Sequence, residues 1–169
     1  WDGDYHLHPD ERFLTMVENS IYPVDSVKEY FNTSTSTLNP HNVGQTFYVY
    51  GTFPLFLVRY IAEGLNQTGY SQVHIVGRYL SAIFDLGVVL LVYFIAQKLF
   101  KNPAISLLSA LFYGLATLPI QQSHYFTVDT FANFFVALAL YLAICIFTDK
   151  KRIPKDNGKK HISRDVGLH

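Results

Sequence analysis

The feature that most limits the possible folds of this chain is the absence of charged residues over long stretches. No charged residue occurs between Lys101 and Asp129, and none between Asp129 and Asp149. Each stretch holds an apolar run that approaches or reaches the roughly 20 residues a helix needs to cross a membrane. A third stretch, ahead of Lys98, is equally apolar except for Asp85. A chain of 169 residues is too short to bury three such helices in a soluble core. We predict spanning helices at about residues 75–99, 104–122 and 128–148.

Composition excludes several other classes of protein. Hydrophobic residues make up 50% of the chain and charged residues 15%, against about 25% charged residues in soluble domains. This balance argues against a disordered chain, a soluble globule and a basic domain that binds nucleic acid. The single cysteine, Cys145, excludes a disulfide framework and a cysteine-based zinc site. We therefore predict an all-α polytopic membrane protein.

The net charge of zero is a sum of unequal parts. Residues 1–63 contain eight acids and three bases, whereas the tail from Asp149 onward contains seven bases and three acids. The connection that holds Lys98 and Lys101 is also basic. Short basic connections mark the cytoplasmic side of a membrane, so we expect both this turn and the tail to be cytoplasmic.

The same reasoning divides the chain into three parts. We expect an extracytoplasmic segment with juxtamembrane helices at 1–74, a transmembrane region at 75–148, and a basic cytoplasmic tail at 149–169. The outer side would be the exterior of a bacterial cell membrane or the lumenal side of the endoplasmic reticulum. Because no signal peptide or spanning helix precedes Trp1, we expect the chain to be an internal piece of a longer protein or a protein whose N-terminal helix has been lost.

Helix signals are present in the outer segment. Pro9 suits the first position of a helix, Asp10 and Glu11 would occupy its first turn, and its apolar stripe would contain Phe13, Met16 and Val17. A short helix is expected at 25–31, followed by a polar loop. The aromatic-rich stretch 48–63, with Gly64 as its stop, suits a helix lying in the membrane interface; a buried or re-entrant helix is an equal alternative.

Three potential metal ligands alternate at the start of the chain. In an extended backbone, His6, His8 and Asp10 would point to one side, and imidazole with carboxylate suits zinc or manganese. A divalent metal is therefore a possible cofactor, although such alternation is also common by chance and no fourth ligand is fixed by spacing.

Ionisable residues in or beside the spanning segments are the strongest functional candidates. Asp85 lies within a span, where a charged group marks a functional or pairing site; a structural pair with a neighbouring helix is the alternative. Arg78 lies near the outer end of the same helix, where a guanidinium suits phosphate binding. His124 and Asp129 border the outer loop, and Asp129 alternatively caps the third helix.

Five stretches together resemble a known family. They are WDGD (1–4), HPDERF (8–13), YGTFPL (50–55), GRYLSAIFD (77–85) and QQSHYFTVD (121–129). Their order resembles that of GT-C membrane glycosyltransferases, above all the group of protein O-mannosyltransferases and aminoarabinose transferases (glycosyltransferase family 39 and bacterial relatives). The resemblance extends from Trp1 to about Phe147.

The resemblance implies an inverting transfer of sugar from a polyprenyl-phosphate-linked donor to a hydroxyl of an acceptor protein or glycolipid. It implies that Asp10 is the catalytic carboxylate, with Glu11 beside it, and that Arg78 meets the lipid phosphate. We expect the remaining substrate-binding residues to be His8, Tyr50, His124 and Asp129. As general base, Asp10 would take the proton of the attacking hydroxyl.

Two other functions remain open from sequence alone. The chain would be a non-enzymatic accessory subunit if its helices pack against other membrane subunits and its outer segment is a docking surface. A fragment of a metal or proton transporter is the third reading, with His6, His8, Asp85 and Asp129 as the carriers. Membrane lipids are partners in all three cases.

Overall fold

The computed structural model describes residues 5–150, so the predicted basic tail lies outside the described residues from 151 onward. The described part is entirely helical and contains no strand, which confirms the predicted fold class. Its elements are α1 (Pro9–Glu18), α2 (Val27–Phe31), the 3-10 helix η1 (Pro40–Val43), α3 (Thr52–Gly64), α4 (Tyr70–Phe100), α5 (Pro103–Gly114), α6 (Thr117–Ser123) and α7 (Val128–Lys150).

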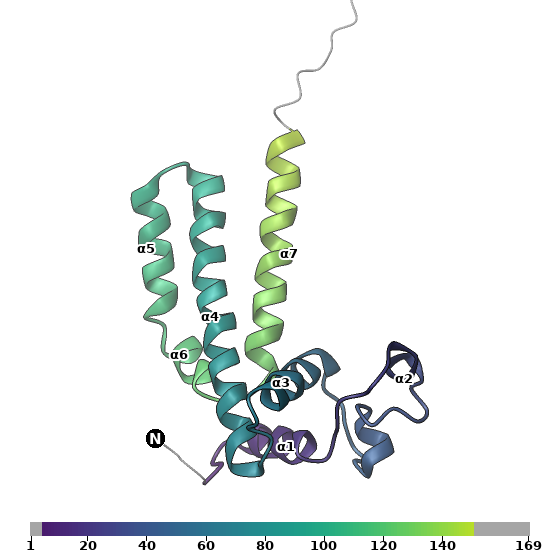
Figure 1. The fold of residues 1–169 in the computed structure, drawn as a ribbon. Helices are drawn as coiled ribbons and strands as arrows, with labels where there is room; N and C mark the ends of the chain where they lie inside the picture. The colour runs from purple at the N-terminus through teal and green to yellow at the C-terminus, as the bar shows by residue number, and fades with distance from the viewer. Residues whose placement is uncertain (1–4, 151–169) are drawn as a thin grey trace, which may run out of the picture.

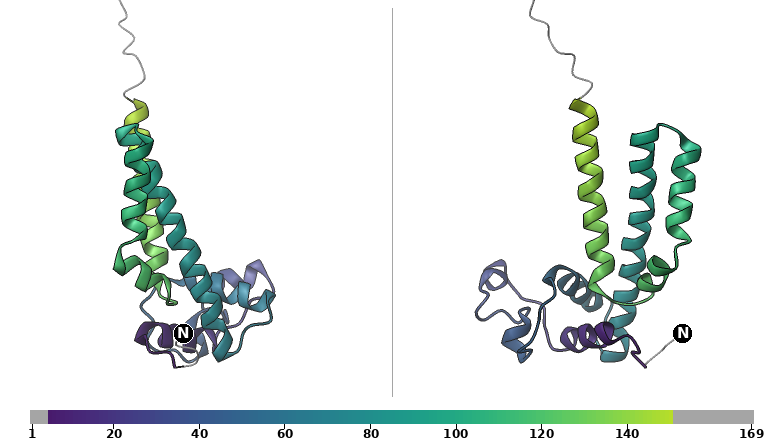
Figure 2. Two further views of the ribbon diagram at one scale, coloured as in Figure 1. Left: turned by 90° about the vertical axis from the view of Figure 1, so that its left-hand side faces the viewer. Right: turned by 180° about the vertical axis from the view of Figure 1, so that it is seen from behind.

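The long helices run side by side, and the shorter ones gather at one end (Figure 1). Helix α4 packs against both α5 and α7. Helices α1 and α3 lie across the end of this bundle where α4 begins, as two further views confirm (Figure 2). Two helices, α4 and α7, are long and apolar enough to cross a membrane, and α5 with α6 makes a third crossing if the bent pair is one span.

The hydrophobic core lies at the end of the bundle where α1 and α3 cross. It joins Leu14 and Val17 of α1, Leu55 and Val58 of α3, and Phe126 ahead of α7, all with at most 1% of their surface exposed. By contrast, large apolar side chains along α5 and α7 remain exposed, for example Leu107, Phe112, Val136 and Phe147. An apolar outer surface above a packed base is the arrangement expected of helices surrounded by lipid.

Close helix packing depends on two glycines of α4. A Cβ at Gly77 would overlap the Phe126 ring, and one at Gly87 would lie 2.6 Å from Cε2 of Phe134 in α7. Only a residue without a side chain lets these rings approach so closely, as at other membrane helix contacts. Glycine at these positions therefore sets the spacing of α4 from α7 and from the loop before it.

The second predicted span is broken, not continuous over 104–122. Helix α5 ends at Gly114, and α6 begins at Thr117 with a bend of 60°. Pro119 explains the break, because it has no N–H to donate to the carbonyl of Leu115 and its ring would clash there in a continuous helix. In the observed structure Pro119 lies in the first turn of α6, where proline is tolerated.

Helix α1 begins at Pro9 as predicted, but its buried face differs from the predicted stripe. Met16 is 50% exposed, whereas Glu11, Leu14, Thr15 and Glu18 are almost fully buried. These four positions follow the i, i+3, i+4, i+7 spacing of one helix face. The face was missed because two of its members are acids.

The remaining boundaries agree closely with expectation. Helix α2 is shorter than predicted because Ser26 caps it, accepting a hydrogen bond from the Glu29 N–H at 3.2 Å. Helix α3 ends at Gly64 and buries one face against the core while Phe53 and Tyr60 stay exposed. Helix α4 begins five residues before the predicted span. The division of the chain at 74 and 148 stays a prediction.

Candidate functional site

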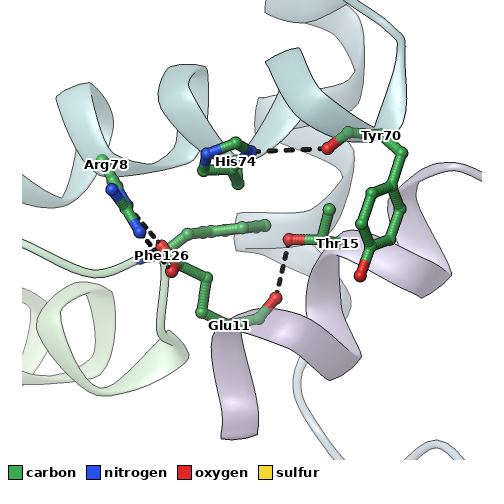
Figure 3. A network of polar contacts seen from close by, with 6 residues as sticks. All are labelled: Glu11, Thr15, Tyr70, His74, Arg78 and Phe126. Carbon is green, nitrogen blue, oxygen red and sulfur yellow. Dashed lines mark hydrogen bonds and ion pairs between the residues drawn. The ribbon is translucent and has the colours of Figure 1, made fainter. Parts of the chain in front are cut away.

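A buried ion pair joins α1 to α4 at the base of the bundle (Figure 3). The Glu11 side chain is fully buried, and its two oxygens accept from Nε and Nη2 of Arg78 at 2.7 and 2.6 Å. The backbone N–H of Phe126 donates to the same carboxylate at 2.9 Å. Three charge-assisted hydrogen bonds compensate for burying the carboxylate. Glu11 therefore connects segments 67 and 115 residues away.

Arg78 reaches this carboxylate from the third turn of α4, with its side chain 13% exposed. The Tyr125 ring lies 5.8 Å from its Cζ, within the range of a cation–π contact. Arg78 also lines a pocket of about 290 Å³ together with His124, which is exposed at the end of α6. Arg78 and His124, both predicted site residues, thus share one pocket.

Asp10 faces different neighbours from Glu11, although the two are consecutive in α1. The half-buried Asp10 carboxylate accepts a hydrogen bond from the Tyr50 hydroxyl at 3.1 Å. Burial raises the pKa of the Tyr50 hydroxyl, and the hydrogen bond to Asp10 and the charges of Asp10 and Asp129 raise it further. Asp129 lies exposed in the first turn of α7. Tyr50 therefore contacts one predicted site residue, Asp10, and lies within range of the charge of another, Asp129.

The alternating residues at the start of the chain do not converge. His6 packs its ring against Tyr70 and His74 of α4, with centroids 4.7 and 4.3 Å apart. The His8 ring instead lies 4.7 Å from Tyr125, and Asp10 turns to Tyr50. The positive φ of His6, 46°, breaks the extended backbone that the alternation requires. Across residues 5–150 no group of three or more His, Cys, Asp or Glu side chains is placed to hold a metal ion.

Asp85 has a structural partner that the sequence did not reveal. Its Oδ1 accepts from the Tyr113 hydroxyl of α5 at 2.8 Å, and Asn133 Nδ2 of α7 donates to that hydroxyl at 2.9 Å. A polar chain therefore runs from α7 through α5 to α4. Tyr113 and Asn133 are polar residues in otherwise apolar helices, and this was the signal available in the sequence.

A second buried acid was also missed. Glu18, at the end of α1, is fully buried, and within the described residues its carboxylate oxygens have no hydrogen-bond partner. Arg59 of α3 donates instead to the Glu18 backbone carbonyl at 2.9 Å and to Glu63 at 3.1 Å. Burial raises the pKa of Glu18 well above its ordinary value, and the charge of Arg59 opposes this only in part.

Comparison with known proteins identifies the family. Residues 26–158 match the model of the family described as dolichyl-phosphate-mannose-protein mannosyltransferase. The chain belongs to this family. No curated protein sequence and no solved structure matches the chain.

Membership of the dolichyl-phosphate-mannose-protein mannosyltransferase family implies transfer of mannose from dolichyl phosphate mannose to a protein acceptor. The matched region contains Tyr50, Arg78, His124 and Asp129, whereas Asp10 and Glu11 precede it. The contacts of Glu11 with Arg78 and of Asp10 with Tyr50 tie α1 to that region.

Proposed function

We propose that this chain carries the catalytic carboxylate of a mannosyltransferase, with Asp10 as the general base on the extracytoplasmic side of the membrane. The observation that carries the proposal is the hydrogen bond between Asp10 and Tyr50 in the neighbourhood of Asp129. Asp10 is half-buried, so it combines access for a substrate with a fixed orientation. Glu11, by contrast, is fully enclosed and committed to Arg78.

The reaction needs a base on one face of the sugar and charge stabilisation on the other. The oxygen of the acceptor hydroxyl forms a bond to the anomeric carbon while the bond between that carbon and the phosphate oxygen breaks. The proton of the hydroxyl passes to Asp10, and dolichyl phosphate leaves with the bonding electrons. A single displacement of this kind inverts the anomeric centre.

Arg78 and His124 are the proposed contacts of the lipid phosphate. They line one pocket at the same end of the bundle as Asp10, and a guanidinium stabilises the negative charge that develops on the leaving phosphate. Glu11 acts here as a positioning residue, because its carboxylate holds the Arg78 side chain through two hydrogen bonds. His8 contacts Tyr125 beside this group.

Replacing Asp10 tests the assignment directly. Asp10→Asn in the full-length protein keeps an oxygen that accepts from Tyr50 but cannot take a proton. We expect transfer of mannose to an acceptor peptide to fall by roughly 10²- to 10⁴-fold, the usual contribution of a general base. Asp25→Asn, at an exposed acid near α2, is the matched control. Full activity of Asp10→Asn in a folded protein would remove Asp10 from the mechanism.

A further inference from the structure

The core leaves a second apolar face of α3 uncovered. Helix α3 buries Leu55, Val58 and Ala62 in the core that it shares with α1 and α4. The opposite side of the helix carries four apolar or aromatic residues at the i, i+3, i+4, i+7 spacing of one face: Phe53, Phe56, Leu57 and Tyr60. Phe53 is 49% exposed and Tyr60 43%. A helix on the surface of a soluble protein would have polar residues on this face.

Helix α2 extends this apolar surface. Val27, Tyr30 and Phe31 are three and four residues apart and therefore share one side of α2. Val27 and Phe31 are each 75% exposed. The Tyr30 ring contacts the Phe56 ring of α3, with centroids 6.1 Å apart. We call these residues of α2 and the uncovered face of α3 the apolar patch.

The apolar patch meets the long helices at Phe53. The centroid of the Phe53 ring lies 5.3 Å from that of Phe135 in α7 and 6.3 Å from that of Phe84 in α4. Phe135 is itself 44% exposed, and it belongs to the apolar surface that α7 presents along its length. The patch is therefore continuous with a surface expected to contact lipid, at the end of the bundle where α3 lies (Figure 1).

We propose that the apolar patch lies in the interface of the lipid bilayer, between the headgroups and the upper part of the acyl chains. The inference goes beyond the proposed function and is independent of which side of the membrane this end of the bundle occupies. Phenylalanine and tyrosine suit such a position, because their rings are apolar and the tyrosine hydroxyl still reaches water. Lipid fits the patch better than a soluble partner protein does, since the patch continues directly into the apolar surface of α7.

Contact of the patch with lipid would also set the depth of α1. Leu55 and Val58, on the core side of α3, belong to the same core as Leu14 and Val17 of α1. Different views place α1 beyond α3, further from the long helices (Figure 1, Figure 2). A bilayer that touches the patch therefore leaves α1, with Asp10 in its first turn, on the aqueous side of α3.

Tryptophan placed in the patch tests its depth. Trp1→Phe provides a background without tryptophan, because the chain has a single one, and Tyr60→Trp and Phe31→Trp each put one indole in the patch. The full chain is placed in nanodiscs of phosphatidylcholine, either plain or brominated near the top of the acyl chains, and iodide serves as the quencher in water. We expect brominated lipid to reduce the fluorescence of both variants, because an interfacial helix lies about 5–10 Å into the boundary of headgroups and acyl chains.

Met16→Trp in the same background is the matched control. Met16 is 50% exposed, about as much as Tyr60, but it belongs to α1. We expect iodide to quench this indole and brominated lipid to leave it unchanged.

The proposal is overturned if brominated lipid leaves Tyr60→Trp or Phe31→Trp as bright as plain lipid does. Quenching by iodide would then show that the face is open to water, and protection from both quenchers would show that another part of the protein covers it. Equal quenching of Met16→Trp by brominated lipid would also overturn the proposal, because the patch would then be no deeper than α1.

Discussion

At the scale of single residues, two neighbouring acids have been given different environments. Asp10 and Glu11 follow one another in α1, and a helix turns by about 100° per residue. Asp10 therefore reaches Tyr50 at the edge of the core, while Glu11 points inward to Arg78 and Phe126. The division separates an accessible carboxylate from a structural one.

The buried pair between Glu11 and Arg78 makes a prediction for stability. Glu11→Ala leaves the guanidinium without its carboxylate and frees the Phe126 N–H inside the core. We expect the free energy of unfolding to fall by roughly 3–5 kcal/mol, measured by denaturation in detergent. Asp25→Ala removes an exposed acid near α2 and should cost no more than about 1 kcal/mol. Equal losses in both variants would contradict the structural role of Glu11.

Glu18 predicts a dependence of stability on pH. Burial raises its pKa in the folded protein above the value in the unfolded chain, so the folded state binds its proton more tightly. The stability that this provides is fully present below the ordinary carboxyl pKa and is lost as pH rises through the raised value. Glu18→Gln should show a smaller decrease in melting temperature from pH 5 to pH 8 than the wild type does. Parallel profiles for the two proteins would show that Glu18 does not titrate in this way.

At the scale of helices, the contact of α4 with α7 depends on a missing side chain. A methyl group at Gly87 would overlap the Phe134 ring, so the helices would have to move apart. We expect Gly87→Ala to lower the stability of the protein by roughly 1–3 kcal/mol, the usual cost of overpacking. The measurement is again denaturation in detergent.

Two further variants test this explanation of Gly87. Phe134→Ala, combined with Gly87→Ala, should give a smaller loss of stability than the sum of the two single losses, because the ring that the methyl group meets is gone. Gly114→Ala should be tolerated, since a Cβ there meets nothing within 4 Å. If the loss in the double variant equalled the sum of the two single losses, the contact between the methyl group and the Phe134 ring would not be the cause.

How much of these elements the sequence predicts depends on the kind of signal. Runs of uncharged residues and the Pro9 start were read correctly, because they follow from local composition and local geometry. Gly114 and Pro119 were local signals of the break before α6. The length needed to span a membrane nevertheless led to the prediction of one continuous helix at 104–122. The partners of Glu11 were not predictable, since they lie on other elements and depend on how the helices pack. For Asp85 the sequence offered candidates in Tyr113 and Asn133, but only the packing of the helices selects them. Arg78 was assigned to a phosphate, and only the fold brings it to Glu11.

At the scale of the whole molecule, polar groups gather at one end and in one internal chain. In the described part of the bundle, the core, the pair of Glu11 with Arg78 and the Asp10 site involve α1, which lies with α3 at one end (Figure 1). The turn between α4 and α5, which contains Lys101 and follows Lys98 in the last turn of α4, lies at the opposite end. If the long helices cross a membrane, these two ends lie on opposite sides.

Orientation in the membrane is therefore testable with one cysteine at a time. Cys145→Ser provides a background without cysteine, because the chain has a single one. We expect a membrane-impermeant maleimide to label Lys101→Cys from the cytoplasmic side and Gln67→Cys, in the loop before α4, from the other. Labelling of both positions from one side would exclude the proposed topology, and reversed labelling would place the Asp10 site in the cytoplasm.

The contact between Glu11 and the Phe126 N–H has a consequence for synthesis of the chain. The ribosome completes α1 long before it reaches residue 126, which follows Glu11 by 115 positions. Until that loop is made, the carboxylate lacks one of its partners, and the core against which α1 packs lacks Phe126. The bond between Glu11 and the Phe126 N–H can therefore form only after the α6–α7 connection has been made, whereas the pair with Arg78 can form earlier.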